Sequence, residues 1–237
     1  TVPIYQRNYA WRAPQIEQLI SDIQDAVVRQ ESTYFLGNLV VTPRGHPRKD
    51  FAVIDGQQRL VSLSIIIAVL RDLERDPDLM RQLDALLVEP GDKLRGIVTE
   101  PRLTLRERDA AFFREHVQED NLESVFDMND DDLATAAQRN IVANIRKTYD
   151  EISNWSDAER QQFAQYLVNE VTLVIVTTDD LDGAHRIFDV MNMRGLPLTS
   201  SDVFKARATA GLSTAELDVY AARWDDIIDP IGDDPHD

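Results

Sequence analysis

Apolar residues recur at helical spacing through the first third of the chain. After an extended, aromatic-rich stretch over residues 1–13, Pro14 opens a predicted amphipathic helix. The apolar face of this helix consists of Ile16, Leu19, Ile20, Ile23 and Val27. A second, strongly apolar helical pattern covers residues 56–75, and Pro77 starts a third predicted helix that ends near residue 88.

Shorter apolar runs predict strands between and after these helices. Residues 34–42 and 51–54 form two such runs, and the turn-rich residues between them predict a hairpin loop. Residues 94–106 predict one or two short strands. The β-branched run over residues 171–178 predicts a buried strand.

Helical patterns dominate the second half of the chain. They cover residues 107–117, 131–154, 157–169, 182–192, 200–211 and 214–229. The sequence therefore predicts an α+β fold, in which a small mixed α/β subdomain precedes a mostly helical part. We expect the first region to span residues 1–120 and the helical region to span residues 121–237.

The charge of the chain limits its partners. Its 25 Lys and Arg residues against 42 Asp and Glu residues give a formal net charge of −17. The average field therefore excludes the coating of DNA or of an anionic membrane, and any polyanion contact needs a local basic patch. The candidates are Arg44, Arg48 and Lys49 in the predicted loop, and Arg102, Arg106 and Arg108 beyond it. The alternative is that these side chains only solvate the surface.

Two absences exclude further classes of chemistry. The chain has no cysteine, which excludes disulfides, thiol catalysis and Cys-based metal sites and fits a reducing, cytoplasmic compartment. Its four histidines do not have zincin spacing. The longest apolar run, residues 60–70, is too short to span a bilayer. Because the chain starts without Met and ends in a polar tail, we expect it to be a piece of a longer protein.

The strongest candidate site is Asp55-Gly56-Gln57-Gln58-Arg59, between a predicted strand and an apolar helix. A helix N-terminus after a glycine turn presents free N–H groups and a positive dipole end to an anion. The glutamines can donate to phosphate oxygens or orient a water, Arg59 can bind phosphate in a bidentate way, and Asp55 can hold Mg²⁺. The alternative is a capping box between Asp55 and Gln58, with Arg59 on the surface.

Two further polar clusters have similar alternatives. Residues 5–11 interleave aromatic side chains with Gln, Arg and Asn, which suits base stacking, but the same aromatics can instead fill the core. Residues 192–202 combine an Arg-Gly-x-Pro turn with a capping box for the next helix, and Lys205 can reach a phosphate. The alternative there is a well-capped helical corner. His185, early in a predicted helix, is interpreted as a satisfied structural residue.

Taken in order, four segments resemble one protein family. They are Pro3-Ile4-Tyr5-Gln6-Arg7-Asn8-Tyr9-Ala10-Trp11, Phe35-Leu36-Gly37-Asn38-Leu39-Val40-Val41, Val53-Ile54-Asp55-Gly56-Gln57-Gln58-Arg59-Leu60, and the stretch from Ile187 to Lys205 with Arg194-Gly195 and Pro197-Leu198. Together they resemble the DUF262 family, the N-terminal module of GmrSD-type modification-dependent restriction systems. They are also similar to the N-terminal half of the SspE-type phosphorothioate sensors. The resemblance covers residues 1–211.

The resemblance implies a fold and an activity that the residues alone do not show. It implies a first part similar to ParB and sulfiredoxin, and hydrolysis of nucleoside triphosphates with Mg²⁺. It implies sensing of modified DNA, carrying phosphorothioate or a modified cytosine, in bacterial defence against phage. It also implies a C-terminal HNH-type nuclease, which we cannot place in this chain. No membrane partner is expected.

The resemblance also assigns roles to residues. It implies that Asp55, Gln57, Gln58 and Arg59 are catalytic, with Asp55 as the metal ligand. It implies nucleotide binding by Arg7, Gly56, Arg194, Asp202 and Lys205. Tyr5, Gln6, Arg44, Arg48 and Lys49 become candidates for contact with DNA or its modification. Two rival functions remain, a nucleotide-dependent DNA-binding switch of ParB type without hydrolysis and a pure interaction domain that uses the acidic C-terminal segment.

Overall fold

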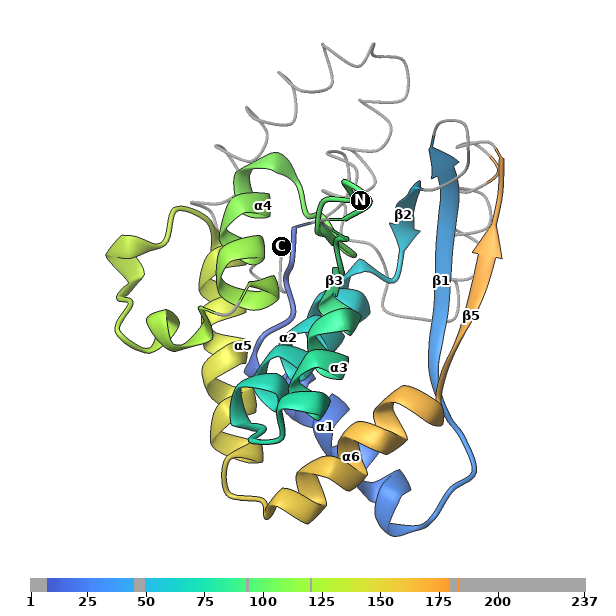
Figure 1. Ribbon diagram of the computed structural model, residues 1–237, viewed down its shortest axis with the longest axis vertical. Coiled ribbons are helices and arrows are strands. Elements are labelled where there is room, and N and C mark those ends of the chain that lie inside the picture. The colour runs from blue at the N-terminus through green and yellow to red at the C-terminus, as the bar shows by residue number, and fades with distance from the viewer. Residues whose placement is uncertain (1–7, 45–49, 93, 120, 180–182, 184–237) are drawn as a thin grey trace, which may run out of the picture.

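A three-stranded sheet stands beside a group of packed helices (Figure 1). The computed structural model describes residues 8–44, 50–92, 94–119, 121–179 and 183. The central strand β1 (Tyr34–Arg44) pairs antiparallel with β2 (Asp50–Asp55) and parallel with β5 (Val171–Thr177). The sheet thus joins the predicted hairpin to a strand that lies well over a hundred residues later in the chain.

Both pairings of β1 contain an irregularity. Val40 pairs with Asp55 and Val41 pairs with Val53, so Ile54 is an extra residue in β2. The pairing with β5 shifts between Phe35 and Gly37. Such bulges bend a strand and redirect its side chains. The two shifts flank residues 37–40 of β1, and Val40 in this part pairs with Asp55, the last residue of β2.

Six α-helices and several short elements make up the rest of the described chain. The helices are α1 (Ala13–Val28), α2 (Gln57–Leu73), α3 (Pro77–Leu87), α4 (Glu107–Phe113), α5 (Ala136–Ile152) and α6 (Asp157–Asn169). A π-helical turn, η1 (Arg114–Gln118), continues α4. The short elements are β3 (Val88–Glu89), β4 (Glu100–Pro101), η2 (Leu122–Phe126) and η3 (Asp130–Asp132).

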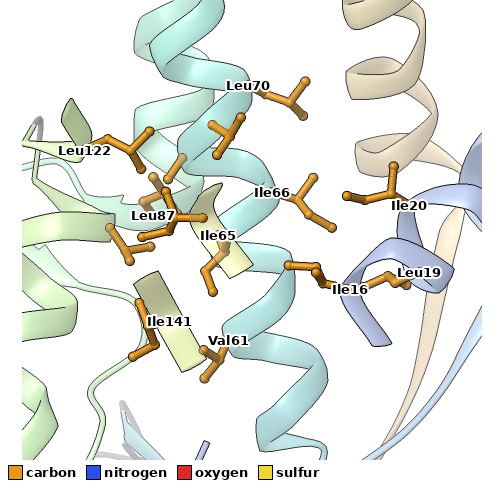
Figure 2. Close-up of a cluster of buried hydrophobic side chains, with 14 of the residues drawn as sticks. Ile16, Leu19, Ile20, Val61, Ile65, Ile66, Leu70, Leu87, Leu122 and Ile141 are labelled. Carbon is orange, nitrogen blue, oxygen red and sulfur yellow. The ribbon is translucent and has the colours of Figure 1, made fainter. Parts of the chain in front are cut away.

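Helix α2 lies at the centre of the main core. In Figure 2, Ile16, Leu19 and Ile20 of α1 lie on one side of α2. On its other side lie Leu87, Leu122 and Ile141. Because α2 buries side chains on both sides, its apolar run does not show the one-sided pattern of a surface helix. The core takes residues from both sides of position 120, and the division into two regions there stays a prediction.

A buried arginine fixes the end of the π-helical turn. Arg71 of α2 is only 3% exposed, and its guanidinium donates to the main-chain oxygens of Val117, Gln118 and Glu119. A helix end leaves such carbonyl groups without intrahelical partners. The same guanidinium forms an ion pair with Asp84 of α3 at 2.8 Å. Arg71 therefore ties α2, α3 and η1 together.

The α+β class and most predicted elements are confirmed, and residues 94–106 contain one short strand, β4, as predicted. Two differences remain. The helix expected over residues 131–154 begins only at Ala136, after the 3₁₀ turn η3. Strand β5 forms as predicted, but its burial was wrong, because Val174 is 51% exposed and Ile175 61% exposed at the edge of the described sheet.

Three predicted helices lie outside the described residues. They are the helices expected over residues 182–192, 200–211 and 214–229. Across the described part of the chain, no helix combines the length and apolar content that a bilayer crossing requires.

Candidate functional site

The junction of β2 and α2 depends on Gly56. This residue precedes the first turn of α2 with φ of +94°, in the left-handed region that favours glycine. A Cβ atom at this position would lie 2.8 Å from Cδ1 of Leu39 and 3.2 Å from the main-chain oxygen of Asn38. Glycine therefore allows the helix start to pack directly against β1.

The N-terminus of α2 carries no side-chain cap from the described residues. The capping box between Asp55 and Gln58 is therefore wrong, because the chain turns at Gly56 and places Asp55 at the end of β2. Helix N-termini without a cap have free N–H groups that can bind water or an anion.

Arg59 and Asp55 meet beside this helix start. Nη2 of Arg59 lies 3.8 Å from Oδ2 of Asp55, which is an ion pair but too long for a hydrogen bond. Nη1 of Arg59 donates to the main-chain oxygen of Asn38 in β1. The two side chains are 25% and 21% exposed. The arginine is thus held on one side by β1 and faces a carboxylate on the other, within reach of solvent.

Gly37 makes room for this guanidinium. Gly37 has φ of +130°, and a Cβ atom there would lie 2.9 Å from Nη1 and 3.2 Å from Cζ of Arg59. A side chain at this position would therefore displace Arg59 from its place against β1. Sequence reasoning assigned no role to Gly37 or Asn38, although both lie in the second of the four matching segments.

The two glutamines of the motif have different surroundings. Gln57 is the first residue of α2 and is 7% exposed. Oε1 of Gln58 accepts from the N–H groups of Ala10 and Trp11, at 2.8 and 3.1 Å. Its Nε2 donates to the main-chain oxygen of Asn8 at 2.9 Å. The Gln58 amide is therefore engaged with the N-terminal stretch.

Tyr9 belongs to the core. It is 1% exposed, and its hydroxyl lies 2.8 Å from Oγ of Ser62 and accepts from Nδ2 of Asn144 at 2.7 Å. Burial raises the pKa of the Tyr9 phenol to about 12. Trp11 is partly buried and packs against the same core. Base stacking is therefore wrong for Tyr9, because folding has buried its ring.

The basic candidates separate in the structure. Arg44 is exposed at the end of β1. Arg106 is only 6% exposed and lies 3.7 Å from the buried carboxylate of Asp109. Surface DNA contact by Arg106 is therefore wrong. Arg102 pairs with Glu89 at 2.7 Å, so its charge is already offset.

Several proposed site residues lie outside the described residues. They are Tyr5, Gln6, Arg7, Arg48, Lys49, Arg194, Asp202 and Lys205. His185, which the sequence indicates as a structural residue, also lies outside them.

Asp55, which lies beside Arg59, is the carboxylate that this site offers to Mg²⁺. The described residues include no group of three or more His, Asp or Glu side chains arranged to hold a metal. Mg²⁺ is often held by one or two protein carboxylates together with substrate phosphates, so Asp55 alone fits that mode. A surface pocket of about 620 Å³ lies elsewhere, between β4, α4 and η1.

The comparison with protein families identifies the chain. Residues 1–209 match the family described as GmrSD restriction endonuclease, N-terminal domain. The chain belongs to this family. A search of curated proteins finds no match. The match confirms the family resemblance and makes the chain an N-terminal module of a restriction system.

In this GmrSD N-terminal domain, sequence reasoning missed the two asparagines that hold residues 8–11. Nδ2 of Asn140 donates to the main-chain oxygen of Tyr9 at 3.1 Å. Nδ2 of Asn144 donates to the main-chain oxygen of Trp11 at 2.8 Å. Both asparagines lie on α5, more than 120 residues after this stretch. The only sign of these contacts in the sequence was the four-residue spacing of the two asparagines, which places them on one face of a helix.

Proposed function

We propose that this domain binds and hydrolyses a nucleoside triphosphate at the N-terminus of α2, and that hydrolysis regulates a nuclease domain of the full-length restriction protein. The observation that carries the proposal is the placement of Arg59 and Asp55 beside an uncapped helix start, among the described residues. Membership of the GmrSD N-terminal family supports a role in a restriction system.

The start of α2 suits the binding of phosphate groups. Its first N–H groups and its dipole favour an anion, and α2 has 17 residues, so the dipole is well developed. Gly56 allows the left-handed turn into α2, because a Cβ there would collide with Leu39 and Asn38 of β1. In this proposal the phosphates lie against residues 56–59.

Arg59 supplies the positive charge for the transferred phosphoryl group. A guanidinium has five N–H donors, and the contact with Asn38 leaves Nη2 directed toward the Asp55 side. Because β1 holds the other side of the group, Arg59 loses little freedom when a phosphate arrives. Preorganised donors of this kind stabilise charge that develops in phosphoryl transfer.

Asp55 would hold Mg²⁺ jointly with the phosphate oxygens. The metal offsets negative charge on the phosphates when it is bound. Asp55 is partly exposed, and its ion pair with Arg59 is long, so its carboxylate can accept a ligand without leaving a buried partner among the described residues unpaired.

Gln57 and Gln58 have different roles in this proposal. Gln57 lies at the first position of α2 and is the candidate for orienting the attacking water. The Gln58 amide already bonds to residues 8–11, which removes it from direct contact with water unless that stretch moves. This occupied amide favours one alternative function, a nucleotide-dependent DNA-binding switch that does not hydrolyse its ligand.

DNA contact in this proposal uses a local basic patch. Arg44 ends β1, and Arg48 and Lys49 lie in the sequence between β1 and β2. A local patch is needed because the chain carries a formal net charge of −17. Tyr5 and Gln6 are the candidates for contact with a phosphorothioate or a modified cytosine. Arg7, Arg194, Asp202 and Lys205 complete the proposed nucleotide site.

Phosphate release tests this function. ATP, GTP, CTP and UTP are offered with Mg²⁺ to the chain and to Asp55→Ala, without DNA, with plain DNA and with phosphorothioate or modified-cytosine DNA. Hydrolysis that disappears in Asp55→Ala and changes only with modified DNA supports the proposal. Nucleotide protection against melting without phosphate release supports the non-hydrolysing switch. A folded chain that neither binds nor hydrolyses any nucleotide contradicts both.

A further inference from the structure

Residues 8–11 form an extended stretch that is held by side chains. Three amide side chains bond to its main chain: Gln58 from α2, and Asn140 and Asn144 from α5. They bond to the main-chain oxygens of Asn8, Tyr9 and Trp11 and to the N–H groups of Ala10 and Trp11. Such contacts take the place of strand pairing for these polar groups.

We propose that Gln58, Asn140 and Asn144 form an amide clamp on residues 8–11, and that the clamp couples nucleotide at the first turn of α2 to the N-terminal segment. Gln58 is then a positioning residue. This inference deepens the proposed function and rests on it. The coupling follows from the chain itself, because Gln58 directly precedes Arg59 in the first turn of α2.

The two ends of the clamp have different strengths. Tyr9 is anchored in the core by its ring and by Ser62 and Asn144, so this end stays in place as long as the fold does. Upstream of Tyr9, Nε2 of Gln58 donates to the main-chain oxygen of Asn8. Loss of the Gln58 amide should therefore loosen the main chain between Asn8 and Trp11 while the core stays folded.

Coupling between two sites acts equally in both directions. If nucleotide restrains the first turn of α2, it also restrains Gln58 and protects the clamped main chain. Conversely, weakening the clamp from the α5 side weakens nucleotide binding, although Asn140 bonds to the oxygen of Tyr9 rather than to the motif. A net hydrogen bond contributes about 1 kcal/mol, which corresponds to a change of about fivefold.

Amide hydrogen exchange at Ala10 and Trp11 tests the clamp without any nucleotide. Exchange should accelerate at least about fivefold in Gln58→Ala, which loses all three Gln58 bonds. Gln58→Glu, which keeps an acceptor for the two N–H groups but cannot donate to Asn8, should lie in between. The control Arg81→Ala replaces an arginine that is 76% exposed and should leave exchange unchanged. Equal exchange in all four proteins overturns the clamp.

Binding of a non-hydrolysable nucleoside triphosphate analogue with Mg²⁺ tests the coupling. The analogue should slow exchange at Ala10 and Trp11 in the unsubstituted chain, and Asn140→Ala should bind it about fivefold more weakly. Unchanged affinity in Asn140→Ala together with lost affinity in Gln58→Ala overturns the coupling, because Gln58 then contacts nucleotide directly. An analogue that fails to bind the unsubstituted chain refutes both the proposed function and the coupling. Amide hydrogen exchange at Ala10 and Trp11, measured without nucleotide, still tests whether the clamp holds this stretch.

Discussion

Replacing Gly37 by alanine should displace the Arg59 guanidinium from the candidate site without unfolding the domain. The new Cβ would lie 2.9 Å from Nη1 and 3.2 Å from Cζ of Arg59, closer than side chains tolerate. The end of a flexible arginine side chain can move away at a low cost in free energy. The collision therefore displaces the guanidinium rather than destabilising the fold. Arg59 then leaves its contact with the oxygen of Asn38 and its place beside Asp55.

The expected magnitudes differ for stability and for activity. A non-glycine residue at φ of +130° costs about 1–3 kcal/mol of backbone strain. A misplaced charge-stabilising donor lowers catalysis by about a hundredfold. The matched control is Gly96→Ala, because Gly96 also has a positive φ, +68°, but a Cβ there meets no atom within 4 Å. Gly96→Ala should lose about 1–2 kcal/mol of stability and keep its activity.

The assay is phosphate release at saturating nucleotide and Mg²⁺, at a temperature where circular dichroism shows every variant folded. Gly37→Ala should turn over about a hundredfold more slowly than Gly96→Ala. In an Arg59→Ala background, Gly37→Ala should cause no further loss, since the group it displaces is gone. Equal turnover in Gly37→Ala and Gly96→Ala would refute the role given to this glycine.

Three further predictions concern stability and DNA binding. Because burial raises the pKa of Tyr9 from 10.0 to about 12, its protonated form stabilises the fold below about pH 10, and this stabilisation is lost as the pH rises toward 12. The unfolding free energy of the parent should therefore fall relative to that of Tyr9→Phe, by up to about 3 kcal/mol, in denaturant titrations over that window. Arg71→Met, which leaves three carbonyl groups and Asp84 without their partner, should lose about 3 kcal/mol or more by the same measurement. Replacing Arg44, Arg48 and Lys49 by alanine should reduce the slope of log K against log salt for DNA binding by about 0.9 per lost phosphate contact, and an unchanged slope would exclude the loop.

The periodic pattern was sufficient for α1 because it reflects the face that the helix buries. The apolar positions from Ile16 to Ile23 predicted this helix, and the same residues are buried in it. The burial of β5 could not be predicted in the same way. Its β-branched residues favour a strand, but exposure depends on which elements cover the sheet, and Ile175 is exposed.

The candidate site was predictable only where its parts are adjacent in sequence. Asp55 and Arg59 are four residues apart across a strand–helix junction, and the sequence placed them together. The surroundings of Arg59 come from a distant segment, with Asn38 and Gly37 in β1. The N-terminal stretch that Gln58 binds is likewise held from a distance, by Asn140 of α5. Local rules do not specify these contacts, which the tertiary packing of α2 against β1 and α5 creates.

Two errors show how tertiary contacts override local patterns. Asp55 with Gln58 has capping-box spacing, yet the turn needs a residue at φ of +94° and the chain therefore starts the helix after Gly56. Arg106 is a charged side chain of the kind expected on the surface, but Asp109, three residues later, is a buried partner for it. The sequence did contain a signal for the Arg106–Asp109 pair, since opposite charges three residues apart meet on one helical turn.

The most direct test of the central claim is the turnover of Arg59→Ala against Arg81→Ala. Both variants remove one arginine, but Arg81 is 76% exposed and pairs with Asp78 on the surface of α3. With both proteins folded and supplied with nucleoside triphosphate and Mg²⁺, Arg59→Ala should release phosphate more than tenfold more slowly, and Arg81→Ala should match the parent. Full activity in Arg59→Ala would contradict the proposal that this arginine stabilises phosphoryl transfer at the start of α2.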